Sequence, residues 1–209
     1  MKASLSVTGL TKRFAHRRVI DDVNLQAQSG EVVGIIGANG SGKSTLVKMI
    51  AGLVRPDAGS VNLTIDSAPI DASLVREHCG LVAPYLELYV EFTPIELLRL
   101  HAQLHGKHID DSHVDSLLEL VQLSSSSTRI VRGFSSGMRQ RVAIALAVSL
   151  NPALLLLDEP GVTLDEAGRS ALAQCIDIAR QNGSIILLAT NDDRERSLCD
   201  RVVRMNSHG

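Results

Sequence analysis

The chain has 209 residues, of which 44% are hydrophobic, and a net charge of −2. This length can bury one α/β core with an inserted subdomain, but it excludes two independent nucleotide-binding domains. Because the basic residues are dispersed and the net charge is slightly negative, nothing favours nucleic acid as a partner. The three cysteines lie far apart and lack the spacing of zinc sites or disulfides, which suits a reducing cytosol.

No membrane-spanning segment is expected. The most apolar region, residues 142–157, is interrupted by Ser149, Asn151 and Pro152, and it is shorter than the roughly 20 apolar residues that cross a bilayer. Residues 1–8 lack the long apolar segment of a signal peptide. If the protein works at a membrane, another chain must therefore carry the spanning helices.

Three short strands are predicted near the N-terminus, at residues 5–7, 19–25 and 32–36, with Gly9 and Gly30 as turn signals. Phe14 lies between the first two and is one of five aromatic residues, two Tyr and three Phe. Its ring could stack on an adenine or pack in the core, and the residue type alone leaves both open.

The third predicted strand leads into a phosphate loop. The pattern of Gly, four residues and Gly-Lys-Ser/Thr is met without a mismatch, and the apolar spacing after it predicts a helix. Glycines let successive backbone N–H groups surround a phosphate chain, Lys43 would reach the outer phosphates, and the Ser44 hydroxyl would ligate magnesium. The nucleotide-binding residues of this loop are Gly37, Ala38, Asn39, Gly40, Ser41, Gly42, Lys43, Ser44 and Thr45.

The amino-acid composition changes in the middle of the chain. Strands are predicted at residues 60–65 and 80–83, and residues 84–94 then contain three of the five aromatic residues and two prolines. Thr93 is expected to cap a helix from Pro94 to about residue 105, and residues 113–123 form a second helix. Histidines at 101, 105, 108 and 113 invite a metal site, but no carboxylate pattern completes it, so surface histidines are expected.

Residues 134–141, Phe-Ser-Ser-Gly-Met-Arg-Gln-Arg, lead into an apolar helix at residues 142–150. Small residues with free N–H groups at a helix N-terminus can bind an anion. The alternative is an ordinary Ser cap.

A predicted buried strand at residues 154–157 ends in two acids, Asp158 and Glu159. The carboxyl ends of parallel strands are where α/β proteins bind their ligands. There Asp158 could hold magnesium, directly or through water, and Glu159 could orient and deprotonate an attacking water. A helix at residues 170–180 and a buried strand at 184–189 follow.

Together the phosphate loop, the residues Ser135-Ser136-Gly137-Met138 and the pair Asp158-Glu159 resemble the nucleotide-binding subunit of an ABC transporter over essentially the whole chain. The resemblance implies an α/β fold: a RecA-like P-loop NTPase core with a mostly parallel sheet, a small N-terminal antiparallel β region and an inserted α-helical subdomain. Residues 1–83 and about 151–209 would form the core, and about 84–150 the helical subdomain with the signature.

The resemblance also implies a mechanism that uses ATP and Mg²⁺. Two subunits, identical or related, sandwich two nucleotides head to tail, and the signature of one closes over the phosphate loop of the other. Lys43 and Glu159 are then the catalytic residues, with Ser44 and Asp158 on the metal. The remaining nucleotide contacts would be Phe14 on the adenine, Ser135 and Gly137 in the signature, Asp165 in the loop at the dimer interface, and Asn191 after the last strand.

Three departures from the family pattern stand out. In the signature, Ser136 and Met138 replace a Gly and a Gln. Pro84 occupies the place of a Gln that contacts magnesium and water, and a proline has neither a polar side chain nor an N–H. Asn191 occupies the place of a histidine, and an amide cannot carry the charge of an imidazolium. We therefore expect slow but real hydrolysis.

The expected protein is a cytoplasmic ATPase subunit at the inner face of the cell membrane, bound to a separate permease. The leucines and aromatics of residues 85–92, Tyr85, Leu86, Leu88, Tyr89 and Phe92, would form the docking groove or the core of the helical subdomain, and both roles stay open. The compact length of the chain is similar to the ATP-binding subunit of the haem exporter of cytochrome c biogenesis, and export of lipids, drugs or other small molecules fits equally. The alternative is a non-transport or regulatory ABC ATPase with weak hydrolysis.

Overall fold

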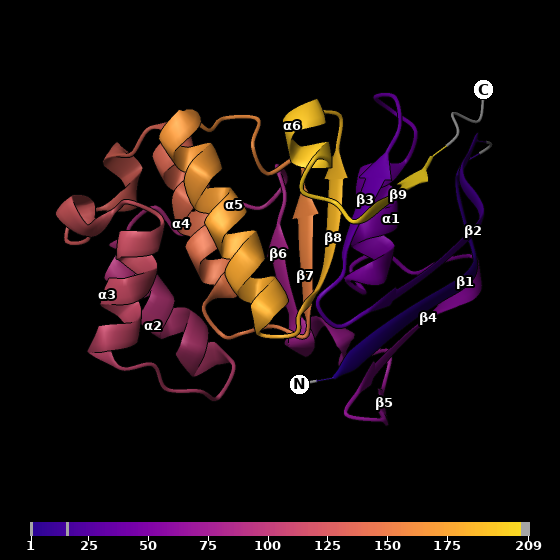
Figure 1. The fold of residues 1–209 in the computed structure, drawn as a ribbon, viewed down its shortest axis with the longest axis horizontal. Coiled ribbons are helices and arrows are strands. Elements are labelled where there is room, and N and C mark those ends of the chain that lie inside the picture. The colour runs from indigo at the N-terminus through magenta and orange to yellow at the C-terminus, as the bar shows by residue number, and fades with distance from the viewer. Residues whose placement is uncertain (1, 16, 206–209) are drawn as a thin grey trace.

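The fold has two sheets, one parallel and one antiparallel (Figure 1). A computed structural model describes residues 2–15 and 17–205. The parallel sheet has the strand order β6-β7-β8-β3-β9 and the antiparallel sheet the order β2-β1-β4-β5.

Four strands of the parallel sheet follow the predicted strands closely, whereas the fifth, β9, was not predicted. The sheet consists of β3 (Val32–Ile36), β6 (Cys79–Val82), β7 (Leu154–Asp158), β8 (Ile185–Thr190) and β9 (Arg201–Arg204). Every residue of β3, β7 and β8 is buried, because helices or the second sheet cover both faces. All pairings are parallel, so the carboxyl ends of the five strands meet at one edge.

The antiparallel sheet is larger than the sequence predicted. Its strands are β1 (Ala3–Phe14), β2 (Arg17–Gln28), β4 (Ala58–Ile65) and β5 (Ala68–Ile70). The short apolar runs at residues 5–7 and 19–25 cover only part of β1 and β2, whose buried residues also include Ala3, Leu10 and Ala27. Beyond them the two strands continue as a largely exposed ribbon whose register shifts past Val7, near Gly9 with its φ of 61°. Backbone pairing therefore extends into polar sequence.

Helices cover the parallel sheet on opposite faces (Figure 1). On one face α1 (Lys43–Ile50) packs in a core with Leu154 and Leu156, and on the other α4 (Ser136–Val148) and α5 (Glu166–Gln181) share a core with Leu155 and Leu157. This alternation follows from the period of two in a strand. The phosphate-loop helix and the signature helix therefore lie in different layers of one chain.

The helical region is completed by α2 (Pro94–Leu104) and α3 (Asp111–Leu120). Thr93 and Glu96 cap α2 reciprocally, as a Thr before a Pro-initiated helix predicts. The helix predicted at 113–123 begins earlier, because the Asp110 side chain accepts from the His113 N–H. The short elements are the 3₁₀ turns Val75–His78, Ser124–Ser126 and Val131–Gly133, and the helix α6 (Asp193–Arg196).

Across the described residues, 2–15 and 17–205, no helix combines the length and the hydrophobicity needed to cross a membrane.

Candidate nucleotide-binding site

The loop between β3 and α1 depends on its glycines. Gly40 and Gly42 have φ values of 79° and 98°, in the left-handed region that other residues rarely adopt. A Cβ on Gly37 would lie 2.7 Å from both the Met205 carbonyl oxygen and the Ser41 hydroxyl. Packing at Gly37 and left-handed backbone angles at Gly40 and Gly42 thus disfavour side chains in this loop, and its backbone can approach a phosphate closely.

Lys43 folds back over this loop. Its Nζ donates to the carbonyl oxygens of Gly37 and Ala38, at 2.8 and 3.4 Å, and to Asn191 Oδ1 at 3.1 Å. Glu159 Oε1 lies 3.8 Å away. Only 5% of Lys43 is exposed. The ammonium group is therefore already held at the mouth of the loop, where a bound phosphate would replace the carbonyl contacts.

Asn191 joins the loop to the end of β8. Its Nδ2 donates to Asn39 Oδ1 at 2.6 Å, while its Oδ1 accepts from Lys43. Because β8 pairs with both β3 and β7, its carboxyl end brings Asn191 to the same edge as the phosphate loop. One neutral amide thus links two parts of the loop that are four residues apart.

Asp158, at the carboxyl end of β7, is completely buried, and neither of its carboxylate oxygens has a hydrogen-bond partner. Burial raises the pKa of Asp158, and the nearby Ser44 hydroxyl counteracts part of that rise. A buried carboxylate without a partner beside a hydroxyl fits the ligand preference of Mg²⁺. No group of three or more His, Cys, Asp or Glu among the described residues could hold a metal by itself, so an ion here would also need oxygens from a nucleotide or water.

Glu159 has a φ of 49°, unusual for a residue with a side chain, and its N–H donates to the Ala189 carbonyl oxygen at 2.8 Å. This bond fixes the turn after β7 against β8. The Glu159 side chain is about one-third exposed and lines an open cavity of about 310 Å³ together with Asn39 and Asn191. Its carboxylate can therefore meet both solvent and the phosphate loop.

The signature lies on the other side of the sheet. Ser135 is exposed and caps α4, because its hydroxyl accepts from the Met138 N–H at 3.2 Å. The ordinary capping role is confirmed, and the anion-binding role stays a prediction. A Cβ on Gly137 would lie 2.9 Å from the Thr163 carbonyl oxygen, so the first turn of α4 packs directly on the loop after β7.

The two remaining predicted contacts are both exposed. Asp165 caps α5, its Oδ1 accepting from the Gly168 N–H at 2.8 Å. Phe14 ends β1 with 49% of its surface exposed, so packing in the core is the wrong alternative for this ring. The Lys12 ammonium lies 5.6 Å from the centre of the ring. The face of Phe14 is thus available to a planar ligand.

The family follows from sequence comparison. A sequence model described as ABC transporter matches residues 20–162, the segment that contains the phosphate loop, the signature and both acids. The chain belongs to the ABC transporter family. Its α/β ABC-type P-loop fold, predicted above, is confirmed.

Several proteins resemble this ABC-family chain along most of its length. It is 36% identical over 201 residues to the uncharacterized ABC transporter ATP-binding protein YdbJ of Bacillus subtilis, covering 95% of this chain and 65% of YdbJ. It is 33% identical to the daunorubicin resistance ATP-binding protein DrrA3 of Streptomyces coeruleorubidus, with 95% and 64% covered. It is also 33% identical to the Nod factor export ATP-binding protein I of Burkholderia lata, with 96% and 67% covered. The chain thus spans less than two thirds of YdbJ and DrrA3.

Two solved structures share the fold. An ATP-binding subunit of an ABC transporter superposes with a TM-score of 0.85 at 30% identity, covering 97% of this chain and 86% of that one. A dimeric ATP-binding cassette in a post-hydrolysis state, bound to ADP and Pi, superposes with a TM-score of 0.84. The second is 24% identical, with 97% and 94% covered, and shows the fold alone.

The structure brings Tyr85 into contact with Lys48 of the phosphate-loop helix, a contact that the sequence did not predict. Tyr85, assigned above to the membrane-facing segment, has a buried hydroxyl without a hydrogen-bond partner. The Lys48 ammonium lies 3.8 Å from the centre of its ring. The sequence contained one indication that Lys48 lies near the site. Lys48 follows Ser44 by one helical turn and therefore lies on the same face of the helix.

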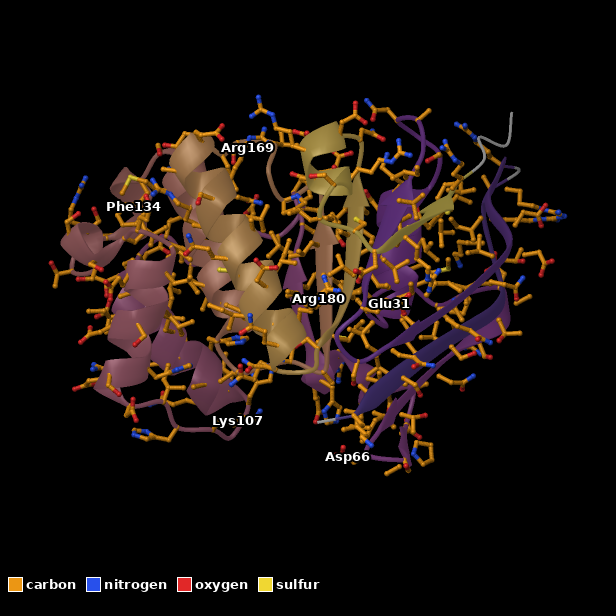
Figure 2. All side chains as sticks on the ribbon, in the orientation of Figure 1. Glu31, Asp66, Lys107, Phe134, Arg169 and Arg180 are labelled. Carbon is orange, nitrogen blue, oxygen red and sulfur yellow. The ribbon has the colours of Figure 1, made fainter. Side chains whose placement is uncertain are left out.

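Behind the site, Arg169 and Glu195 tie the turns together. Arg169 Nη1 pairs with Asp192 Oδ2 at 2.8 Å, and Figure 2 shows Arg169 near the sheet edge where β7 and β8 end. Glu195 is buried, and a Cβ on Gly161 would lie 2.1 Å from its Oε1. The loop after β7 and the loop after β8 are therefore in direct contact, and neither residue was found from the sequence.

Of the four histidines expected at the surface, His105 and His108 are exposed, whereas His101 and His113 are partly buried. His101 is half-buried, its ring centre is 4.5 Å from that of His105, and burial lowers the pKa of His101 to about 4.

Proposed function

We propose that this chain binds and hydrolyses ATP and powers transport through a separate membrane permease by ATP-driven head-to-tail pairing of two cassettes. One observation carries the proposal. Lys43, Asp158 and Glu159 gather at the carboxyl edge of the parallel sheet, whereas Ser135 and Gly137 open a helix that packs on the face of the sheet opposite to α1. One chain therefore holds a phosphate loop and a signature that belong to two different nucleotide sites, and a second cassette would complete both sites.

The roles follow from the contacts. An ATP phosphate in the loop would draw the Lys43 ammonium from the carbonyl oxygens of Gly37 and Ala38. Asp158 and Ser44 would hold Mg²⁺, whose charge offsets that of the phosphates. Glu159 would accept a proton as a water oxygen bonds to the γ-phosphorus and the bond to ADP breaks. Asn191 would donate to the γ-phosphate through the amide that now contacts Asn39.

The direction of transport that we propose is export. The named relatives are a daunorubicin resistance protein and a Nod factor export protein, which favours an organic small molecule. Haem export rested on chain length and finds no support among these relatives. The permease would dock in a groove of about 530 Å³ that Leu86, Leu88 and Val90 line with the start of α4 and with Glu159, which would place the subunit at the inner face of the membrane. Tyr85, Tyr89 and Phe92, also predicted for docking, are not among the residues that line this groove.

A mixing experiment tests head-to-tail pairing. Lys43→Ala breaks the phosphate loop and Ser135→Arg breaks the signature, so each variant alone should lose ATPase activity. A mixed dimer contains one site in which both elements are intact, and mixing should therefore restore activity. Absence of any recovery, with both variants folded by circular dichroism, would overturn the shared-site arrangement.

Hydrolysis is tested by Mg²⁺-dependent phosphate release. Glu159→Gln should lower the rate at least about 100-fold, whereas Glu119→Gln, at an exposed position on α3, should not change it. ATP binding with no release above background, equal in wild type and Glu159→Gln, would favour the regulatory alternative, in which ATP is clamped without turnover.

A further inference from the structure

Tyr85 carries a polar group that the proposed mechanism leaves unused. Its hydroxyl is buried and without a hydrogen-bond partner, as are both carboxylate oxygens of Asp158. A buried hydroxyl without a partner is destabilising, and such groups are unusual in folded proteins unless a ligand or water completes them. Two such groups in one region therefore indicate a site that is finished by something bound.

The fold explains why Tyr85 reaches Asp158. β6 pairs with β7 in parallel, with Val82 opposite Leu157, so that residue 83 comes level with Asp158. The Leu86 N–H then donates to the Ala83 carbonyl oxygen at 3.1 Å, which closes a turn around Pro84 and Tyr85. Proline is favoured at the second position of such a turn because its φ is fixed. Pro84 thus supplies no amide side chain, unlike the Gln of the family pattern, but it favours the turn from which the Tyr85 side chain points inward.

Lys48 holds the Tyr85 ring in place. Its ammonium lies 3.8 Å from the ring centre, within the range of a cation–π contact. Lys48 and Ser44 are one turn apart on α1 and therefore project from the same face. The ring thus contacts a side chain of the phosphate-loop helix, and Tyr85 lies within electrostatic range of Asp158 at the end of β7.

We propose that Tyr85 is a positioning residue of the magnesium–phosphate site, whose hydroxyl donates a hydrogen bond to an oxygen in the coordination shell of the ion held by Asp158 and Ser44. It supplies the polar contact that Pro84 lacks. The inference rests on the proposed function, because it needs Mg²⁺ and a nucleotide in the loop.

The protonation state of Tyr85 suits a donor. Burial, and after it the negative charge of Asp158, raises the pKa of Tyr85 to about 12. The hydroxyl therefore keeps its proton throughout the neutral range. A phenol that remains neutral can donate toward oxygen ligands without adding charge to a region that already holds Asp158 and Glu159.

The first test compares two hydroxyl deletions in the full chain. Tyr85→Phe keeps the ring beneath Lys48 and removes only the oxygen, and Tyr89→Phe removes the hydroxyl of a tyrosine that is 66% exposed. In a Glu159→Gln background, Mg²⁺ affinity of the ATP-loaded protein is measured by titration calorimetry, and ATP affinity is measured separately in EDTA. Tyr85→Phe should weaken Mg²⁺ binding about tenfold with ATP affinity in EDTA unchanged, and Tyr89→Phe should change neither.

Two results would overturn the inference. If Tyr85→Phe binds Mg²⁺ like wild type, the hydroxyl does not contact the shell. If it lowers the melting temperature and weakens both affinities equally, the hydroxyl contributes to packing instead. Failure of the chain to bind ATP at all would instead refute the proposed function.

The second test uses the tyrosines as reporters. The chain has no tryptophan and two tyrosines, so Tyr89→Phe leaves Tyr85 as the sole tyrosine emitter. Mg²⁺ added to the ATP-loaded protein should change Tyr85 emission, and Mg²⁺ added without nucleotide should not. Emission that stays constant while calorimetry shows Mg²⁺ binding would overturn the inference, because the hydroxyl would then lie outside the shell.

Discussion

The Lys43 ammonium lies 3.1 Å from the amide oxygen of Asn191, and the nitrogen of the same amide donates to Asn39 at 2.6 Å. The loop after β8 thus holds the phosphate-loop lysine through a neutral group. A neutral acceptor binds an ammonium group less strongly than a carboxylate does. Lys43 can therefore exchange this contact for a phosphate at low cost.

This relationship predicts the effect of Asn191→Asp, which keeps the shape of the side chain, adds a negative charge and removes the donor to Asn39. The carboxylate should pair with Lys43 and weaken ATP affinity more than about tenfold because it repels the γ-phosphate. Calorimetry measures the effect.

Asn62→Asp is the matched control, since it adds the same charge on the exposed part of β4. It should leave ATP affinity unchanged. If Asn191→Asp binds ATP as tightly as wild type, the amide does not face the phosphates.

The burial of Asp158 predicts that replacing its carboxylate raises the stability of the protein but abolishes metal binding. Burial raises the pKa of Asp158, so the folded chain binds this proton more tightly than the unfolded chain does. The stability contributed by the group is present below the ordinary carboxyl pKa of about 3.9, and it is lost as the pH rises through the higher folded value. At neutral pH, Asp158→Asn should therefore melt about 2–4 °C higher than wild type without Mg²⁺, while Mg²⁺-dependent ATP binding disappears.

The stability gain should vanish below about pH 4, where the wild-type carboxyl is also neutral. Asp115→Asn, at an exposed position on α3, should show no gain at either pH. An equal or lower melting temperature for Asp158→Asn at neutral pH would show that the carboxylate is not an uncompensated charge.

The parts of the site that the sequence predicted are those governed by local chemistry. The glycines of the phosphate loop, the caps of α2 and α4, and the buried strand before Asp158 each depend on residues within a few positions of one another. Short-range hydrogen bonding and periodicity decide such features before any tertiary contact forms.

The direction of Tyr85 could not be predicted in this way. It depends on the register between β6 and β7, whose residues are separated by more than seventy positions, and on a turn that Pro84 only favours. The link between Asn39 and Asn191 spans 152 positions. The outer ends of β1 and β2, beyond Leu10 and Ile20, are held by backbone pairing of mostly polar residues, which leaves no hydrophobic pattern in the sequence.

Phe14 gives a prediction for nucleotide affinity. Its ring is 49% exposed, so Phe14→Ala should leave the melting temperature nearly unchanged, and loss of base stacking should weaken ATP binding about tenfold. Leu104→Ala, at a leucine of α2 that is 72% exposed, should alter neither. Phe14→Trp would introduce the only tryptophan, whose fluorescence should be quenched by ATP. An unquenched tryptophan in protein shown to bind ATP would exclude stacking.

The close packing of Gly80 leads to a prediction about how firmly α4, the signature helix, is held against the parallel sheet. A Cβ at this position of β6 would lie 1.9 Å from the Ala147 carbonyl oxygen of α4, and backbone cannot move aside as a side-chain tip can. Gly80→Ala should therefore lose about 3 kcal/mol or more of unfolding free energy in urea. Gly133→Ala is the control, because no atom lies within 4 Å of its added Cβ, and it should stay within about 0.5 kcal/mol of wild type. Equal stability of the two variants would show that β6 and α4 can separate, and the signature would then move independently of Asp158 and Glu159.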